Sequence, residues 1–137
     1  MPRFSQSSIS RLNTCDKRLK SLFHEVVKHW DCTIVEGFRN EQGQDKAVRE
    51  GASKVSWPDG RHNRLPSLAV DVAPYTKGKG ADWNSRTCLA FGGFVLGIAS
   101  QMHYEVRWGG DWDGDRDVND QKFHDLVHFE VKEEKEV

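Results

Sequence analysis

The stretch "LAVDVAPY", residues 68–75, is a run of mostly apolar side chains with a single charged residue, Asp71. Such a run predicts a β-strand. A carboxylate set among apolar neighbours is costly to bury unless a cation or several hydrogen-bond donors satisfy it. Asp71 is therefore either a hydrogen-bonded structural residue or a metal ligand, and its partners must come from other parts of the chain.

The segments on either side of this strand predict an α+β fold. Apolar positions spaced by three and four residues predict helices, and short β-branched runs predict strands. The expected helices are residues 7–30, 41–51 and 85–103, and the further strands are residues 32–38, 104–110 and 128–132. Residues 52–67 read as a long polar loop and residues 76–84 as a turn. This order predicts a small, mainly antiparallel sheet with flanking helices, and Gly92 and Gly93 would allow close packing against it.

Length and composition narrow the class of protein. A chain of 137 residues suits one domain, residues 1–137. The net charge of −1 shows no basic bias, which argues against a nucleic-acid partner. No apolar run reaches the roughly 18–20 residues of a membrane helix, and the first residues lack the apolar core of a secretory signal peptide. The three cysteines form no C-x-x-C pair and are expected to be reduced and buried. We expect a monomer that does not insert into membranes.

Two histidines could complete a metal site with Asp71. His62 lies in the polar loop nine residues before Asp71, and His128 opens the last predicted strand. Two imidazoles and one carboxylate form a ligand set that suits Zn²⁺ and leaves a fourth position for water, as in catalytic zinc sites. Two alternatives stay open here. In the first, His62 is an ordinary loop residue that binds no metal. In the second, His128 binds metal together with His124, although no H-E-x-x-H motif is present.

Two stretches together resemble the zinc-binding pattern of the M15 peptidase family: "GRHNRLPSLAVDVAPY", residues 60–75, and "HDLVHFEV", residues 124–131. That family includes D-alanyl-D-alanine carboxypeptidases and dipeptidases, and phage L-alanyl-D-glutamate endolysins. Two further stretches are similar to family motifs: "EGFRNEQGQ", which contains Arg39 and Gln44, and "VRWGGDW". The resemblance therefore extends over nearly the whole chain, about residues 33–131.

The resemblance implies a hedgehog/D-Ala-D-Ala-peptidase-like fold and a role for each matching residue. It implies zinc ligation by His62, Asp71 and His128. It implies proton transfer by Asp125, which lies three residues before His128. Arg39 would supply positive charge to the substrate carbonyl oxygen. Substrate contact or hydrogen-bond support of the site is assigned to three other residues: Gln44, His124 and Glu130.

The acidic segment "DWDGDRDVND", residues 111–120, is a separate signal. Acids alternate at its first positions, as at the start of a calcium-binding loop, and the segment offers five of them: Asp111, Asp113, Asp115, Asp117 and Asp120. The EF-hand pattern is not met, because the sixth position is Arg116 rather than glycine and the twelfth is Lys122 rather than glutamate. A solvated acidic loop and a regulatory Ca²⁺ site next to the catalytic residues are both consistent with this pattern.

The expected function is that of a zinc metallopeptidase that hydrolyses peptide bonds in peptidoglycan stem peptides. The resemblance favours a phage endolysin with L-alanyl-D-glutamate endopeptidase activity, made in the host cytoplasm and acting in the periplasm or cell wall after release. A D,D-carboxypeptidase or dipeptidase of the same family is the alternative within this class. Two alternatives lie outside the zinc metallopeptidases. One is a non-catalytic, metal-containing cell-wall or virion module, and the other is a non-haem Fe(II) oxygenase with a two-histidine, one-carboxylate site.

Overall fold

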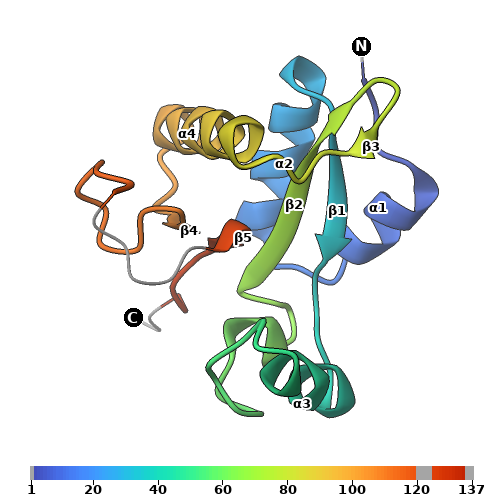
Figure 1. The fold of residues 1–137 in the computed structure, drawn as a ribbon, viewed down its shortest axis with the longest axis vertical. Coiled ribbons are helices and arrows are strands. Elements are labelled where there is room, and N and C mark those ends of the chain that lie inside the picture. Colours follow the sequence, from blue (N-terminus) through green and yellow to red (C-terminus); the bar gives the residue numbers. More distant parts are fainter. Residues whose placement is uncertain (1, 120–124, 135–137) are drawn as a thin grey trace.

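A small antiparallel sheet forms the centre of the protein (Figure 1). The structure is a computed structural model and describes residues 2–119 and 125–134. The strands are β1 (Cys32–Glu36), β2 (Ala69–Thr76), β3 (Gly80–Ala81), β4 (Arg107–Gly109) and β5 (Asp125–Glu130). They pair in the order β1-β2-β5-β4, with β3 on β2, and each of these pairings is antiparallel. The predicted α+β class is confirmed.

The helices lie around this sheet. They are α1 (Gln6–Leu12), α2 (Lys17–His29), α3 (Glu41–Arg49) and α4 (Ser85–Gln101), and a 3₁₀ turn, η1 (Arg61–Asn63), interrupts the polar loop. The core side chains of α2 and α4 pack on the sheet, whereas α3 and the following loop lie beyond the end of β1 (Figure 1). Within the described residues, no helix combines the length and the apolar character needed to cross a membrane.

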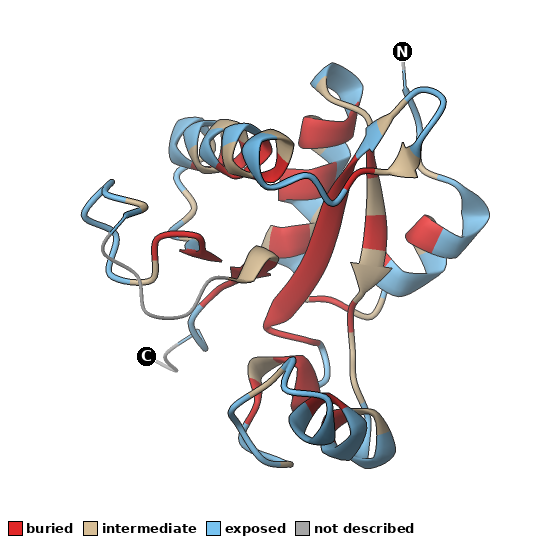
Figure 2. Ribbon diagram, viewed as in Figure 1, coloured by how far each residue is buried: buried red, intermediate tan, exposed pale blue. Residues whose placement is uncertain are grey.

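The two faces of the sheet carry different kinds of residue, because side chains alternate along a strand. Val70, Val72 and Phe129 join the core cluster together with Phe23 of α2 and Phe91 of α4. The ring of Phe129 makes edge contacts with both aromatic rings, with centroid distances of 5.4 and 6.3 Å. Figure 2 shows β2 buried along most of its length. The residues that alternate with this core set include three polar side chains: Asp71, His128 and Glu130.

The first predicted helix, residues 7–30, is two helices in the structure. The N–H of Asp16 donates to the Ser67 carbonyl, and the N–H of Ser67 donates to the Thr14 carbonyl, each at 2.8 Å. The side chain of Asp16 also caps α2 by accepting from the N–H of Arg18. The apolar periodicity continues across the break, so spacing alone could not reveal it. The pairing with a distant residue fixes the end of the polar loop just before β2 begins.

Two glycines permit close approach to the last strands. A Cβ at Gly92 of α4 would collide with the indole of Trp108, so the predicted close packing is confirmed there. Gly93 is exposed and has open space where a Cβ would be, so the prediction is wrong for that residue. A Cβ at Gly109 of β4 would collide with the carbonyl oxygen of Asp125. β4 can therefore lie directly against the start of β5.

Several boundaries differ from those predicted. β5 begins at Asp125 rather than at residue 128, because Asp125 pairs with Gly109. Only Arg107–Gly109 of the predicted strand at residues 104–110 forms a ladder. Residues 76–84, expected as a turn, include the short strand β3. The three cysteines are free and buried, as expected.

Candidate metal centre and active site

Strand pairing brings Asp71 and His128 together. In the register of β2 with β5, these two residues are direct partners. Nδ1 of His128 lies 3.3 Å from Oδ1 of Asp71, and Nε2 of His62, on η1, lies 3.2 Å from the same oxygen. The three side chains are buried, and each offers one ligand atom within 4.8 Å of the others. The structure thus brings together the three residues predicted as metal ligands.

Each imidazole is held through its other ring nitrogen. Nδ1 of His62 lies 2.8 Å from the carbonyl oxygen of Gly37. A carbonyl only accepts, so this nitrogen carries the proton and donates it. Nε2 of His128 lies 2.8 Å from Oε1 of Glu130 and donates to that carboxylate in the same way. Nε2 of His62 and Nδ1 of His128 are therefore left facing Asp71, and outer hydrogen bonds of this kind are typical of metal-ligating histidines.

The charges at this centre fit a cation. Burial alone would raise the pKa of Asp71, but the two histidines beside it hold that pKa well below its usual range. Burial alone would lower the pKa of His128, but the hydrogen bonds to Asp71 and Glu130 raise it to about 9. The surroundings thus favour positive charge next to an ionised, buried carboxylate. A divalent metal ion would supply the same charge, so the residues present fit a metal with nitrogen and oxygen ligands.

Asp125 stands beside the centre, as predicted, but on the strand rather than on the turn that enters it. The β4–β5 register is irregular between Trp108 and Gly109, and a bulge of this kind re-aims a side chain. Oδ2 of Asp125 lies 4.0 Å from Nδ1 of His128. Burial and the negative charge of Asp71 raise the pKa of Asp125 to about 6. A carboxyl group that titrates near neutral pH is suited to accept and return a proton.

Arg39 borders the same centre and is held by two neighbours. Its Nε and Nη2 donate to the carboxylate of Glu36 at 2.9 and 2.8 Å, and its Nη1 donates to Oε1 of Gln44 at 3.1 Å. Nη2 also lies 3.7 Å from Oδ2 of Asp71. Gln44 is buried and in turn donates from Nε2 to the Val55 carbonyl at 2.5 Å. The predicted pair is thus in contact, and Gln44 holds the arginine in place.

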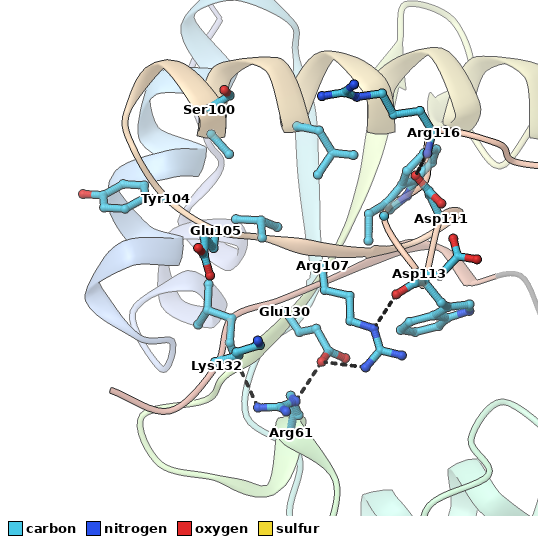
Figure 3. A pocket seen from close by; sticks show the side chains of 17 residues that line it. Arg61, Ser100, Tyr104, Glu105, Arg107, Asp111, Asp113, Arg116, Glu130 and Lys132 are labelled. Atoms are coloured by element: carbon cyan, nitrogen blue, oxygen red, sulfur yellow. Dashed lines mark hydrogen bonds and ion pairs between the residues drawn. The ribbon is translucent and has the colours of Figure 1, made fainter. Parts of the chain in front are cut away.

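A cavity of about 460 Å³ opens at this centre and includes residues that the sequence did not single out. Nε of Arg61 lies 2.7 Å from Oε2 of Glu130, and Nη1 of Arg107 lies 3.8 Å from the same oxygen (Figure 3). The ring of Trp112 packs against His128 with a centroid distance of 5.4 Å. Arg107 and Glu130 are partners across β4 and β5, an opposite-charge pairing that stabilises a sheet. The sequence did not reveal the Arg107–Glu130 pair, because residue types alone do not determine the strand register that brings the two residues together.

The acidic loop gathers a second group of oxygen atoms. Asp111, Asp113 and Asp115 each offer one carboxylate oxygen, and these atoms lie within 4.8 Å of one another. Asp111 is only 5% exposed, and its Oδ1 has no hydrogen-bond partner among the described residues. Asp117 does not join this group in the part of the chain that the structure describes. Two predicted residues lie outside the described residues: Asp120 and His124.

Comparison with known proteins gives two findings. The family described as phage L-alanyl-D-glutamate peptidase matches residues 1–132. Among solved structures, the crystal structure of the Serratia marcescens L-Ala D-Glu endopeptidase ChiX is similar, with a TM-score of 0.71 and 21% identity. The match covers 96% of this chain and 91% of that chain, and at this identity it shows a shared fold. No curated protein matches the chain.

Proposed function

The chain belongs to the phage L-alanyl-D-glutamate peptidase family, and we infer the chemistry of this site from that family. The protein is a peptidoglycan peptidase. We propose that it is a zinc-dependent endopeptidase that cleaves the bond between L-alanine and D-glutamate in peptidoglycan stem peptides. The observation that best supports zinc dependence is the buried group of His62, Asp71 and His128, whose two histidines line the same cavity as Asp125.

His62, Asp71 and His128 would hold the zinc ion. Two imidazole nitrogens and one carboxylate oxygen match the ligand preference of Zn²⁺ and leave one position for water or substrate. The hydrogen bonds from His62 to Gly37 and from His128 to Glu130 select the tautomers that such ligation requires. Zinc bound there would lower the pKa of a water molecule towards about 7 and polarise a carbonyl group.

Asp125 is proposed to move the proton during hydrolysis. Its carboxylate accepts a proton from the attacking water and then delivers it to the D-glutamyl nitrogen as the peptide bond breaks. A pKa of about 6 suits both steps, because the group gains and loses a proton at little cost near neutral pH.

Arg39 is proposed to stabilise the substrate carbonyl oxygen as negative charge develops on it. Its bonds to Glu36 and Gln44 hold the guanidinium group in one orientation beside Asp71. A cation that is already in place needs no rearrangement during the reaction. Gln44 is then a positioning residue that acts through Arg39.

Digestion of purified peptidoglycan tests this proposal. The zinc-loaded protein should release fragments with new L-alanyl carboxyl ends and D-glutamyl amino ends, identified by mass spectrometry. Phenanthroline should stop the reaction, and added zinc should restore it. Release of terminal D-alanine alone would indicate a carboxypeptidase instead, and cleavage that is insensitive to the chelator would defeat the zinc-dependent mechanism.

We also propose that the acidic loop binds Ca²⁺ through Asp111, Asp113 and Asp115. An all-oxygen ligand set suits a hard cation. Burial and the neighbouring acids Asp113 and Asp115 raise the pKa of Asp111, and the hydrogen bond from the N–H of Arg116 offsets this only in part. Its buried Oδ1 has no partner among the described residues and would gain one from the ion. Without an ion, such a group is costly to bury.

Calcium in this loop would act on the catalytic centre through Trp112, which lies between Asp111 and Asp113. The Trp112 ring packs on His128, so ordering the loop would order this contact. Titrating calcium into zinc-loaded protein should raise the melting temperature by several degrees and increase activity. Asp111→Asn should remove both responses, whereas Asp45→Asn, at an exposed position on α3, should keep them. Unchanged melting temperature and activity at millimolar calcium would rule the site out.

A further inference from the structure

The cavity at the catalytic centre is lined by four cationic side chains: Arg39, Lys54, Arg61 and Arg107. Two of the arginines are engaged within the protein. Arg39 is 11% exposed and donates twice to Glu36. Arg61 lies 2.7 Å from Glu130 through Nε and donates from Nη1 to the Val131 carbonyl. In the proposed function Arg39 serves the substrate carbonyl oxygen, and Arg61 could not bind a second carboxylate without losing one of its partners.

Arg107 has less compensation for its charge. Its Nη1 is 3.8 Å from Oε2 of Glu130, the same oxygen that Arg61 approaches more closely. The other oxygen of Glu130 is 2.8 Å from Nε2 of His128. One carboxylate thus serves two guanidinium groups and an imidazole N–H. Among the described residues, Arg107 therefore has no ion pair closer than this shared contact at 3.8 Å.

The Arg107 side chain is nevertheless held in place. Its Nε donates to the Trp112 carbonyl at 2.9 Å, and its guanidinium carbon lies 4.9 Å from the centroid of the Trp112 ring. Within the described residues, its Nη groups make no hydrogen bond, and the side chain is 54% exposed. Figure 3 shows the guanidinium group turned towards Glu130. Such a fixed fork matches a carboxylate in two parallel hydrogen bonds.

The position of Arg107 also suits an extended substrate. It lines both the cavity at the catalytic centre and a neighbouring cavity of about 790 Å³. Trp112, which stacks under its guanidinium group, packs on the ring of His128. Arg107 therefore stands one side chain away from the metal-binding group. A substrate group within a few bonds of the scissile nitrogen could reach it.

The substrate of the proposed function carries such a group. The D-glutamyl residue that provides the scissile nitrogen has two carboxyl groups, and only one of them continues the peptide. We propose that Arg107 binds the free carboxylate of this residue and so selects D-glutamate over its amidated counterpart. The inference rests on the proposed function and adds to it a specificity residue on the leaving side of the scissile bond.

Two synthetic stem peptides test the proposal. Both continue through the γ-carboxyl group of the D-glutamyl residue, and they carry either a free carboxylate or a carboxamide on its α-carbon. Wild-type protein should favour the carboxylate by about 10- to 100-fold in kcat/KM, the range expected for a charge-assisted hydrogen-bonded contact. Arg107→Met keeps an unbranched stem over Trp112 but removes the charge. It should bring the ratio close to one by losing activity on the carboxylate alone, and Arg107→Lys should restore part of the preference.

Arg64→Met is the matched control. Arg64 is 52% exposed and lies 3.1 Å from the carboxylate of Glu133, outside the cavity at the catalytic centre. This variant should leave the substrate preference unchanged. Equal losses on both peptides in Arg107→Met would mean that Arg107 only supports Glu130 and Trp112, and equal cleavage of both peptides by wild-type protein would also overturn the proposal. Cleavage of neither peptide by the wild type would instead overturn the proposed function itself.

Discussion

Among the residues that the structure describes, two groups of side chains could each hold a metal ion, and they are built in opposite ways. The candidate metal centre consists of His62, Asp71 and His128 from η1, β2 and β5, and the antiparallel pairing of the two strands sets the distance between the last two. The carboxylates of the acidic loop come from alternate positions of one short segment, residues 111–115. The group of His62, Asp71 and His128 forms only when distant segments pack together, whereas the group in the acidic loop comes from residues close in sequence.

The two groups also differ in how their polar atoms are satisfied. At the catalytic centre each imidazole has an outward hydrogen bond, and the carboxylate of Asp71 lies between two histidines. In the loop, Oδ1 of Asp111 is buried and has no partner among the described residues. Hydrogen bonds within the protein thus orient the side chains of the first group, whereas the buried Asp111 of the loop has one carboxylate oxygen without such a partner among the described residues.

The largest expected effect separates the two groups directly. His128→Gln removes one zinc ligand, so activity should fall to the level of chelator-treated protein and zinc should no longer raise the melting temperature. Calcium should still raise the melting temperature, because Asp111, Asp113 and Asp115 are unchanged. Thermal unfolding with each metal measures both responses, and His29→Gln, at an exposed histidine paired with Glu25, is the control. Loss of the calcium response in His128→Gln would mean that the groups are not independent.

The second effect concerns chemistry rather than metal binding. Asp125→Asn keeps the shape of the side chain but cannot accept a proton, so kcat should fall by about 10²- to 10⁴-fold. Zinc content, measured by atomic absorption, should remain at the wild-type level. Asp45→Asn, at an exposed position on α3, should retain wild-type kcat. Near-normal kcat in Asp125→Asn would exclude Asp125 from the proton transfer.

A smaller effect is expected at the hydrogen bond behind His128. Glu130→Gln replaces the charged acceptor with a neutral one, and zinc affinity should fall by about 10- to 100-fold. Competition with a chromophoric chelator measures this affinity. Glu133→Gln changes an exposed glutamate, 66% accessible, and should have no effect. If zinc affinity stayed the same in Glu130→Gln, the preorganisation attributed to this bond would be wrong.

The smallest effect is a difference in pH dependence. The pKa of His128 is raised to about 9, so in metal-free protein its protonated form adds stability below about pH 6.5, and this stability is lost as the pH rises through 9. Zinc requires the neutral ring and displaces that proton. The zinc-induced gain in melting temperature should therefore grow from pH 6.5 to pH 9. The calcium-induced gain in melting temperature should change little between pH 7 and pH 9, because the acidic-loop group contains no histidine. A rise of the zinc-induced and calcium-induced gains in parallel would contradict this prediction.

The candidate metal ligands could be named from the sequence because their residue types and their order along the chain resemble a family pattern. The strand around Asp71 was clear from its apolar neighbours, and the final strand from its β-forming residues. Arg61 and Arg107 were not found, because what marks them is contact with Glu130, and that contact depends on strand register and on the path of a loop. Residue types alone carry no information about either.

Two local features of the fold also escaped prediction for physical reasons. The break between α1 and α2 results from backbone pairing with Ser67, a residue far along the chain, while the helical periodicity runs on unchanged. The orientation of Asp125 depends on the irregular register opposite Gly109, whereas strict alternation would have turned it towards the core with Phe129. In both places a long-range contact overrides the local pattern.

The alternation of β5 also limits how this segment can evolve. Phe129 fills the core, and His128 and Glu130, on either side of it, face the catalytic centre. Inserting or deleting one residue here would exchange the two sets, placing an imidazole in the core and a phenyl ring at the metal-binding group. Relatives of this protein should therefore vary in length within the acidic loop but keep a constant number of residues between His128 and Glu130.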